Sequence, residues 1–435
     1  MTIPELHTLF LKHQQVCTDT RKIIDGSIFF ALKGENFNGN KFAQQALEQG
    51  CAYAVIDEKE YAVGNKTILV NNVLTCLQQL ASFHRDYWNT AGGYVRRDVI
   101  ALTGSNGKTT TKELIHAVLR QTMHCYATVG NLNNHIGVPL TLLALKPEHT
   151  LAIVEMGANH QKEIELLCNI AKPNFGIITN VGKAHLEGFG GEEGVLKGKG
   201  ELYDYIRQHD GHIFVNGDDE KLMKIAKGIS AYTYGYGEHN MVKGKILDKN
   251  IFLEMEVSAD GEVKHVATNL TGTYNGINVL CAYAVGWIFD MEHEQIIKGI
   301  ESYTPDNSRS QVVKTGFNTL ILDAYNANPS SMSLALENLA RIDAPQKMFV
   351  LGDMREMGEH AQAEHLAILN KIKELKLNGI LVGEEFSRYR NNFDFTFFEN
   401  TPKALEWLKE MKIKNNLVLI KGSRGIKLEQ VVEAF

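Results

Sequence analysis

The stretch ALTGSNGKTTTKE (residues 101–113) decides how the rest of the chain is interpreted, because an apolar run passes through a glycine-rich turn into a helical pattern. Glycines let a backbone turn approach a phosphate closely, and the following helix adds the positive end of its dipole. Lys108 supplies a mobile cation, and Thr109 or Thr110 offers a hydroxyl to Mg²⁺. The stretch therefore predicts a loop that binds nucleotide phosphates.

This loop is shorter than the common Walker A loop, which places a glycine five positions before its Gly-Lys pair. Here that position is Leu102, and the nearest upstream glycine is Gly104. An ordinary glycine turn with a solvated lysine is the alternative interpretation. If the loop binds a nucleotide, the contacts are expected from Gly104, Ser105, Asn106, Gly107, Lys108, Thr109 and Thr110.

Short apolar runs alternate with helical patterns along the whole chain, as they do in α/β proteins. We predict an N-terminal α/β domain over residues 1–93, a central parallel-sheet domain of the P-loop ATPase type over 94–308, and a C-terminal Rossmann-like domain over 309–435. The segment AGGY (91–94) is the predicted hinge after the first domain. Residues 231–268 are predicted to form an antiparallel insertion in the second.

Composition excludes several classes of protein. The 435 residues carry a net charge of −6 without a basic stripe, which argues against a nucleic-acid binder. The six cysteines form no CxxC pair, as expected for reduced thiols rather than a disulfide framework or zinc site. Neither a signal peptide nor an apolar run long enough to span a membrane is evident, so we expect a soluble cytoplasmic protein.

Three further stretches contain candidate site residues. Glu155 ends the apolar run LAIVEM (151–156), where a carboxylate beside a phosphate loop suits Mg²⁺, although a solvated strand end is the alternative. His185 follows another strand end, and its spacing alone does not decide between a ligand and a packed side chain. Lys197 and Lys199 lie between glycines, which favours a phosphate contact or a solvated loop.

Together these motifs resemble the Mur ligases, which join a carboxylate to an amine using ATP. TGSNGKTT resembles their phosphate loop, and residues 18–42 resemble their uridine-diphosphate-binding domain. The segments GNLNNHIGVPLTLL (130–143) and DAYNANPSSM (323–332) resemble the branch that adds D-alanyl-D-alanine to UDP-N-acetylmuramoyl-tripeptide. The similarity extends over essentially the whole chain.

The resemblance implies catalytic roles for Lys108, His185 and Lys199. It also implies that Mg²⁺ is held by Thr109, Glu155, His185 and Lys199, with Lys199 carbamylated. A carbamate offers anionic oxygens to the metal, whereas an ammonium would repel it. A plain Lys199 ammonium that binds a substrate phosphate is the alternative.

The resemblance further places Asn278, Arg309 and Asp323 at the nucleotide, although the family usually has histidine where this chain has Tyr274. Asn326 and Asn328 would line a pocket for dipeptide and nucleotide, but a turn and helix cap would use the same residues. The remaining substrate-binding candidates are Asn133 and Asn134, and, for the nucleotide sugar, Thr20, Arg21, Lys33, Asn38 and Lys41, each of which is alternatively a surface residue.

The function implied is an ATP-dependent ligase that works through an acyl phosphate. Its partners would be three small molecules, namely ATP, UDP-N-acetylmuramoyl-tripeptide and D-alanyl-D-alanine, and the protein is expected to be a monomer. Three competitors stay open: a family member that adds a single amino acid, a P-loop NTPase that acts as a switch or motor, and a nucleotide-sugar binding protein without catalytic activity.

Overall fold

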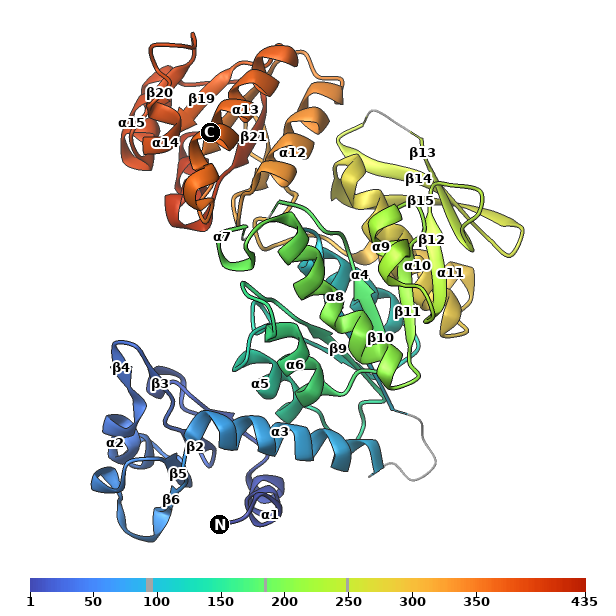
Figure 1. Cartoon of the computed structure of the whole chain (residues 1–435). Coiled ribbons are helices and arrows are strands. Elements are labelled where there is room, and N and C mark those ends of the chain that lie inside the picture. Colours follow the sequence, from blue (N-terminus) through green and yellow to red (C-terminus); the bar gives the residue numbers. More distant parts are fainter. Residues whose placement is uncertain (91–96, 184–185, 248–249) are drawn as a thin grey trace.

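The computed structural model describes residues 1–90, 97–183, 186–247 and 250–435. They form three bodies in chain order, each with its own sheet, so that the two termini lie at opposite ends of the molecule (Figure 1). We call them the N-terminal, central and C-terminal bodies. The predicted α/β class is confirmed, whereas the predicted hinge AGGY (91–94) and His185 lie outside the described residues.

The N-terminal body has a four-stranded parallel sheet of order β1-β2-β5-β6 and a separate β3–β4 hairpin. The chain leaves the sheet after β2, where the Leu32 amide donates to the Phe30 carbonyl at 2.9 Å in a tight turn. The elements are α1 (Ile3–His13), β1 (Val16–Cys17), β2 (Ile28–Phe30), β3 (Lys33–Gly34), β4 (Phe37–Asn38), α2 (Ala43–Glu48), β5 (Tyr53–Ile56), β6 (Thr67–Leu69) and α3 (Val73–Thr90).

The central sheet has nine strands in the order β15-β14-β13-β12-β11-β10-β7-β9-β8. The prediction of antiparallel strands over 231–268 is right for β13, β14 and β15 and wrong for β12, which pairs in parallel with β11 and β13. The insertion therefore extends the main sheet. The strands are β7 (Asp98–Thr103), β8 (Cys125–Ala127), β9 (Leu151–Glu155), β10 (Phe175–Ile178), β11 (His212–Asn216), β12 (Ser230–Gly235), β13 (Val242–Ile246), β14 (Phe252–Ala259) and β15 (Glu262–Thr271).

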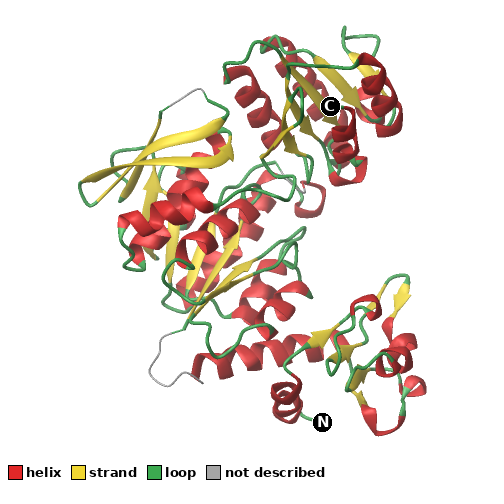
Figure 2. Ribbon diagram, turned by 180° about the vertical axis from the view of Figure 1, so that it is seen from behind, coloured by secondary structure: helices red, strands yellow, loops and turns green. Residues whose placement is uncertain are grey.

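Helices cover both faces of this sheet (Figure 2). The phosphate loop, residues 104–107, joins the carboxyl end of β7 to α4, at the sheet edge where α/β proteins bind ligands. The helices are α4 (Lys108–Leu119), α5 (Gly137–Leu143), α6 (Glu163–Ala171), α7 (Leu186–Phe189), α8 (Glu192–Gln208), α9 (Glu220–Ile225), α10 (Gly276–Ile288) and α11 (His293–Ser302).

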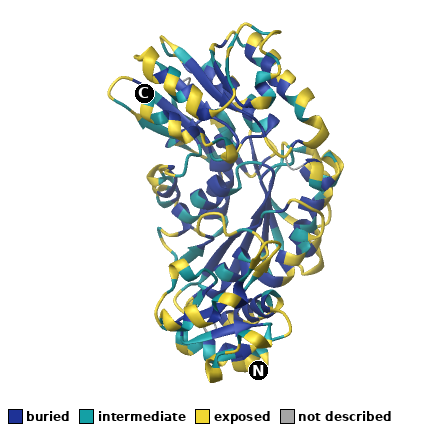
Figure 3. Cartoon of the chain, turned by 90° about the vertical axis from the view of Figure 1, so that its left-hand side faces the viewer, coloured by how far each residue is buried: buried dark blue, intermediate teal, exposed yellow. Residues whose placement is uncertain are grey.

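The C-terminal body has a six-stranded sheet of order β16-β17-β21-β18-β19-β20, in which only the edge strand β16 is antiparallel. The inner strands of the central and C-terminal sheets are buried, whereas outer strands such as β15 and β20 also carry exposed residues (Figure 3). The elements are β16 (Gln311–Lys314), β17 (Thr319–Asp323), α12 (Pro329–Arg341), β18 (Lys347–Gly352), α13 (Ala361–Glu374), β19 (Gly379–Val382), α14 (Glu384–Ser387), β20 (Thr396–Phe398), α15 (Thr401–Met411) and β21 (Leu417–Lys421).

Helix α3 belongs in sequence to the N-terminal body, yet it packs on α5 and α6 of the central body. The buried side chains of α3 extend from Val73 in its first turn to Trp88 near its end. No helix in the described ranges combines the length and apolar composition that a membrane span needs.

Candidate functional site

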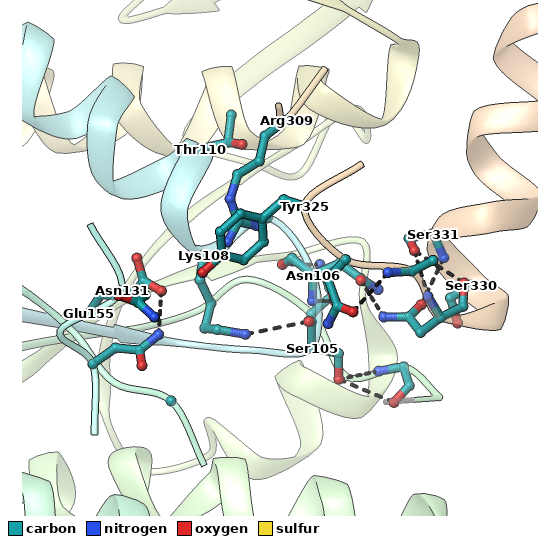
Figure 4. Close-up of a pocket in the computed structure, with 18 of the residues that line it drawn as sticks. Ser105, Asn106, Lys108, Thr110, Asn131, Glu155, Arg309, Tyr325, Ser330 and Ser331 are labelled. Carbon is teal, nitrogen blue, oxygen red and sulfur yellow. Dashed lines mark hydrogen bonds between the residues drawn. The ribbon is translucent and has the colours of Figure 1, made fainter. Parts of the chain in front are cut away.

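A cavity of about 770 Å³ lies between the central and C-terminal bodies. It is bounded by the phosphate loop, the end of β9, the start of α10, the connection at 309–310 and the segment before α12 (Figure 4). The predicted site residues that it brings together are Ser105, Asn106, Gly107, Lys108, Thr110, Asn133, Asn134, Glu155, Asn278, Arg309, Asp323, Asn326 and Asn328.

The phosphate loop depends on glycine at both ends. Gly104 has φ 146° and Gly107 has φ 80°, a region that side chains avoid. A Cβ at Gly104 would lie 2.0 Å from Thr179 Oγ1, and one at Gly107 would lie 2.8 Å from Asn278 Oδ1. The loop is therefore packed against β10 and α10, which holds its backbone in one shape.

Lys108 begins α4 and reaches back over the loop, where Nζ donates to the Gly104 carbonyl at 2.6 Å. Burial lowers the pKa of Lys108 to about 8, helped by the charge of Arg309 and opposed by Glu155. A cation beside Glu155 and at a helix N-terminus makes this end of the cavity suited to phosphate oxygens.

Glu155 is buried at the end of β9 and uses its two oxygens differently. Oε1 accepts from Asn133 Nδ2 at 2.8 Å and from Thr109 Oγ1 at 3.3 Å. Oε2 is buried and has no hydrogen-bond partner within the described part of the chain. A buried carboxylate oxygen without a partner is costly, and a divalent cation would satisfy it.

The oxygen ligands around Glu155 fit Mg²⁺ better than a metal ion that is bound by protein side chains alone. In the described residues, no three His, Cys, Asp or Glu side chains gather as a metal site. Mg²⁺ keeps several waters and takes one or two carboxylates together with substrate phosphates, and Glu155 with the Thr109 hydroxyl offers that kind of set. Asn133, predicted to bind substrate, lines the cavity and donates to Glu155.

Lys199 lies on helix α8, so the predicted loop between glycines is wrong. The glycines serve close packing: a Cβ at Gly198 would lie 2.4 Å from Phe189 Cε1, and one at Gly194 would lie 1.8 Å from the Phe189 carbonyl oxygen. Lys197 faces solvent, whereas Lys199 is 1% exposed.

Lys199 lies behind the cavity wall rather than on it. Its Nζ donates to the carbonyl of Ala158 at 3.1 Å, and Ala158 lines the cavity. Burial places the pKa of Lys199 well below that of an ordinary lysine, and the charge of Lys108 lowers it further. The side chain is therefore a buried amine with a single carbonyl partner among the described residues, and no carboxylate pairs with it there.

The start of α10 connects the cavity to the C-terminal body. Asn278 is buried, accepts from Thr111 Oγ1 at 3.1 Å and donates to Asn275 Oδ1 at 2.9 Å. Tyr274 OH lies 2.9 Å from Ser310 Oγ, and burial raises the pKa of Tyr274. The residue that replaces the family's usual histidine thus bonds to the connection between the two bodies.

On the other side of this connection, Asp323 pairs with Lys421 at 2.5 Å and accepts from the Ser310 amide at 3.2 Å. The Arg309 guanidinium lies 3.7 Å from the centre of the Tyr325 ring (Figure 4). Sequence reasoning missed Lys421 and Tyr325. Lys421 had one available signal, because it is a basic residue at the carboxyl end of the apolar strand β21.

Both alternatives for the asparagines before α12 have structural support. Asn328 is the N-cap of α12, where its Oδ1 accepts from the Ser331 amide at 2.9 Å. Asn326 Oδ1 accepts from the Ala327 amide at 2.9 Å. Both asparagines also line the cavity, so turn and cap formation coexists with a position at the site.

The candidates for the nucleotide sugar lie in the N-terminal body, and none is among the residues that line this cavity. Lys33 pairs with Asp57 at 3.0 Å, and Asn38 Nδ2 donates to Glu58 at 2.9 Å. Arg21 pairs with its neighbour Asp19 and is 86% exposed. Thr20 and Lys41 lie in one-turn helices of the same body.

Comparison with known proteins matches the chain to three domain families in succession. They are the Mur ligase family catalytic domain over residues 12–85, the Mur ligase middle domain over 102–286 and the Mur ligase glutamate ligase domain over 308–424. The UDP-N-acetylmuramoyl-tripeptide--D-alanyl-D-alanine ligase of Bacillus subtilis is 34% identical, over 96% of this chain and 92% of the relative.

Solved structures agree with this assignment. MurF from Acinetobacter baumannii superposes with a TM-score of 0.86 at 30% identity, covering 96% of this chain and 92% of that one. MurF ligase from Thermotoga maritima, solved in complex with ADP, has the same fold at a TM-score of 0.86 and 24% identity, covering 98% of this chain and 97% of that one.

Proposed function

Because this chain belongs to the Mur ligase family, we propose that it is the ATP-dependent ligase that adds D-alanyl-D-alanine to UDP-N-acetylmuramoyl-tripeptide, a step of peptidoglycan precursor synthesis in the cytoplasm. One observation carries the proposal. The phosphate loop and Glu155 face the Asn326–Asn328 segment across a single cavity, so that a nucleotide and an amine acceptor can meet there.

ATP binds with its terminal phosphates on the loop amides and Lys108, and its base lies toward Asn278 and Arg309. Glu155 and Thr109 would hold Mg²⁺, joined by His185 and carbamylated Lys199 according to the family resemblance. Bound there, the metal would supply positive charge between the phosphates and the substrate carboxylate. The unpartnered Oε2 of Glu155 supports that assignment.

The reaction has two steps. A carboxylate oxygen of the tripeptide attacks the terminal phosphorus of ATP, and the bond to ADP breaks, which leaves an acyl phosphate. The free amine of D-alanyl-D-alanine then attacks the carbonyl carbon, and the tetrahedral intermediate collapses with loss of phosphate and a proton. Lys108 offsets the negative charge that builds up, and the two facing bodies align the reactants.

Lys199 carries a carbamate in this proposal. Its neutral amine attacks CO₂, a carbon–nitrogen bond forms and one proton is released. Burial favours the neutral amine of Lys199. If the nitrogen were protonated, the neighbouring Ala158 carbonyl would not neutralise its positive charge. With Lys199→Ala we expect activity to be lost and not restored by added bicarbonate, and full activity in that variant would overturn the carbamate.

Each body has its own substrate in this proposal. Residues 1–93 bind the nucleotide sugar through Thr20, Arg21, Lys33, Asn38 and Lys41, residues 94–308 bind ATP, and residues 309–435 bind the dipeptide. Arginine and lysine suit a diphosphate. We propose that the enzyme acts as a monomer, which sedimentation equilibrium would check.

The deciding experiment measures ADP release with UDP-N-acetylmuramoyl-tripeptide, with and without D-alanyl-D-alanine. We expect sustained turnover only with the dipeptide. Parallel reactions with meso-diaminopimelate, L-lysine or glutamate test the single-residue ligases, and turnover with only one of these would contradict the proposal. ADP release that needs no amine acceptor would indicate an NTPase instead.

A further inference from the structure

We propose that a bond between Asn106 and Asn328 couples the phosphate loop to the C-terminal body, so that the loop fixes the position of the dipeptide site relative to the nucleotide. Asn328 Nδ2 donates to Asn106 Oδ1 at 2.7 Å, across the cavity that separates the two bodies. The inference rests on the proposed function, because it assigns the C-terminal body to the dipeptide.

The loop end of this bond is held in place. The Asn106 amide donates to Asn180 Oδ1 at 3.0 Å, and its carbonyl accepts from Thr179 Oγ1 at 2.6 Å and Asn180 Nδ2 at 3.0 Å. With both backbone groups fixed, the side chain has little freedom and points toward α12, as Figure 4 shows. The Asn106 side chain is therefore a fixed point beside the nucleotide site, to which Asn328 of the C-terminal body bonds.

The helix end is fixed as well. Asn328 uses Oδ1 to cap the Ser331 amide, so its Nδ2 is left for Asn106. This assignment follows from the cap, which needs the oxygen. Asn328 thus makes two hydrogen bonds, one within helix α12 and one to Asn106 of the central body.

Helix α12 transmits the position of its N-terminus to the whole C-terminal body. Met332, Leu336 and Leu339 are fully buried in the core of that body, so α12 cannot shift without it. Asn326 and Leu334, on either side of the cap, line the cavity. The bond to Asn106 therefore holds the wall against which the dipeptide would lie at a set position relative to the phosphate loop.

Two asparagine-to-serine substitutions separate the coupling from the cap. Asn328→Ser keeps a capping oxygen but is too short to reach Asn106. Asn400→Ser is the matched control, because Asn400 caps α15 by accepting from the Lys403 amide at 3.1 Å and does not line the cavity. Asn106→Ser and the double variant complete a cycle with Asn328→Ser.

We expect Asn328→Ser to raise KM for D-alanyl-D-alanine about fivefold at saturating ATP, which corresponds to the loss of one neutral hydrogen bond. Asn400→Ser should have the wild-type KM. The double variant should raise this KM no more than Asn328→Ser does. An unchanged KM in Asn328→Ser, or additive effects in the cycle, would overturn the coupling.

Thermal unfolding is measured for both serine variants, and similar midpoints show that the two caps are equally preserved. If Asn328→Ser is unstable, Asn328→Asp takes its place, because aspartate caps well but cannot donate to Asn106. Wild-type turnover is established first. If wild type needs no D-alanyl-D-alanine, the proposed function fails, whereas normal wild type with unaffected variants contradicts the coupling alone.

Discussion

Helix α3 joins the N-terminal body to the central body through buried side chains. The C-terminal body meets the central body through direct bonds between polar side chains, together with Ile251, which packs against the C-terminal core. In the first joint, Trp88 is 1% exposed and its Nε1 donates to the carbonyls of Lys146 and His149. Arg85 donates to the last carbonyls of α6 and to Asn174 Oδ1 at 3.1 Å. In the second joint, the direct bonds include Asn106–Asn328 and the ion pair Lys183–Glu364.

The two joints differ in the free-energy cost of pulling their bodies apart. Apolar surface that is pulled apart must be hydrated at a large cost, so the first joint holds its two bodies together. Polar side chains exchange their partners for water at little net cost, so the second joint can open and close. We infer that the N-terminal body stays fixed to the central body, and that the C-terminal body provides the motion that opens and closes the cavity between them.

The largest effect is expected from Trp88→Ala. Removing a fully buried indole from the first joint should lower the free energy of unfolding by about 3–5 kcal/mol, through lost burial and the cavity that remains. The guanidinium groups of Arg85 and Arg97, 5.2 Å and 5.5 Å from the ring, would lose their neighbour as well. Urea unfolding followed by circular dichroism measures the change.

Trp407→Ala is the matched control. Trp407 is only partly buried, on the outer helix α15 of the C-terminal body, where it packs against Phe398. We expect it to cost clearly less than Trp88→Ala. The comparison between the joints fails if Trp407→Ala is the more destabilising of the two.

The next effect is acid sensitivity of the first joint. His84 Nε2 lies 3.0 Å from the Leu145 carbonyl and therefore donates to it, so His84 Nδ1 accepts from His7 Nε2 at 3.0 Å. Both rings are then neutral. Burial lowers the pKa of His7 to about 4, helped by His84, and burial also lowers the pKa of His84. Phe10 of α1 and Tyr87 of α3 pack around the pair.

A histidine whose pKa is lowered by folding takes up protons more readily when unfolded. The neutral histidine therefore contributes its full stabilisation above about pH 6.5, and this stabilisation is lost as the pH falls toward 4. For His7 the loss in the free energy of unfolding is about 3 kcal/mol. Between pH 7 and pH 4.5 the free energy of unfolding should fall further in wild type than in His7→Phe, because the variant lacks the group that takes up a proton on unfolding. His360→Phe, at a side chain that is 51% exposed, should follow wild type. Parallel pH profiles of wild type and His7→Phe would contradict the assignment.

The sequence predicted the phosphate loop, because the glycines, Lys108 and the flanking strand and helix are contiguous and each has a local physical reason. The roles of partners far apart in sequence were not predictable in this way. Asn133 bonds to Glu155 because β8 and β9 are neighbours in the central sheet, whereas Asn328 reaches Asn106 only because the C-terminal body faces the central body. Lys199 was assigned to a loop because its glycines suggest a turn, whereas in the fold they let Phe189 pack against α8.

A smaller effect is expected at the connection between the central and C-terminal bodies. Ser308 and Ser310 have φ 57° and 51°, a strained conformation for serine, and the Tyr274 hydroxyl bonds to Ser310. Tyr274→Phe removes that bond and should cost about 1 kcal/mol of unfolding free energy. It should also raise KM for ATP, because Tyr274 lines the cavity.

Tyr283→Phe controls for the lost hydroxyl. Its OH lies 2.7 Å from His293 Nδ1, and both residues belong to the central body. The two variants should lose similar stability by urea unfolding, but only Tyr274→Phe should alter KM for ATP. Equal KM values in both variants would show that the connection does not influence the nucleotide site.

The smallest effect is expected from the ion pair of the second joint. Lys183 Nζ lies 2.8 Å from Glu364, and the side chains are 44% and 15% exposed, so Lys183→Met should cost at most about 1 kcal/mol of unfolding free energy. The pair lies between bodies that we infer to move, so added salt should raise KM for D-alanyl-D-alanine in wild type and much less in Lys183→Met.

Lys371→Met breaks a similar pair with Glu337 inside the C-terminal body, and it should keep the wild-type salt dependence. A loss of several kcal/mol in Lys183→Met would mean that the second joint is as firmly held as the first, because only a well-desolvated pair is worth that much.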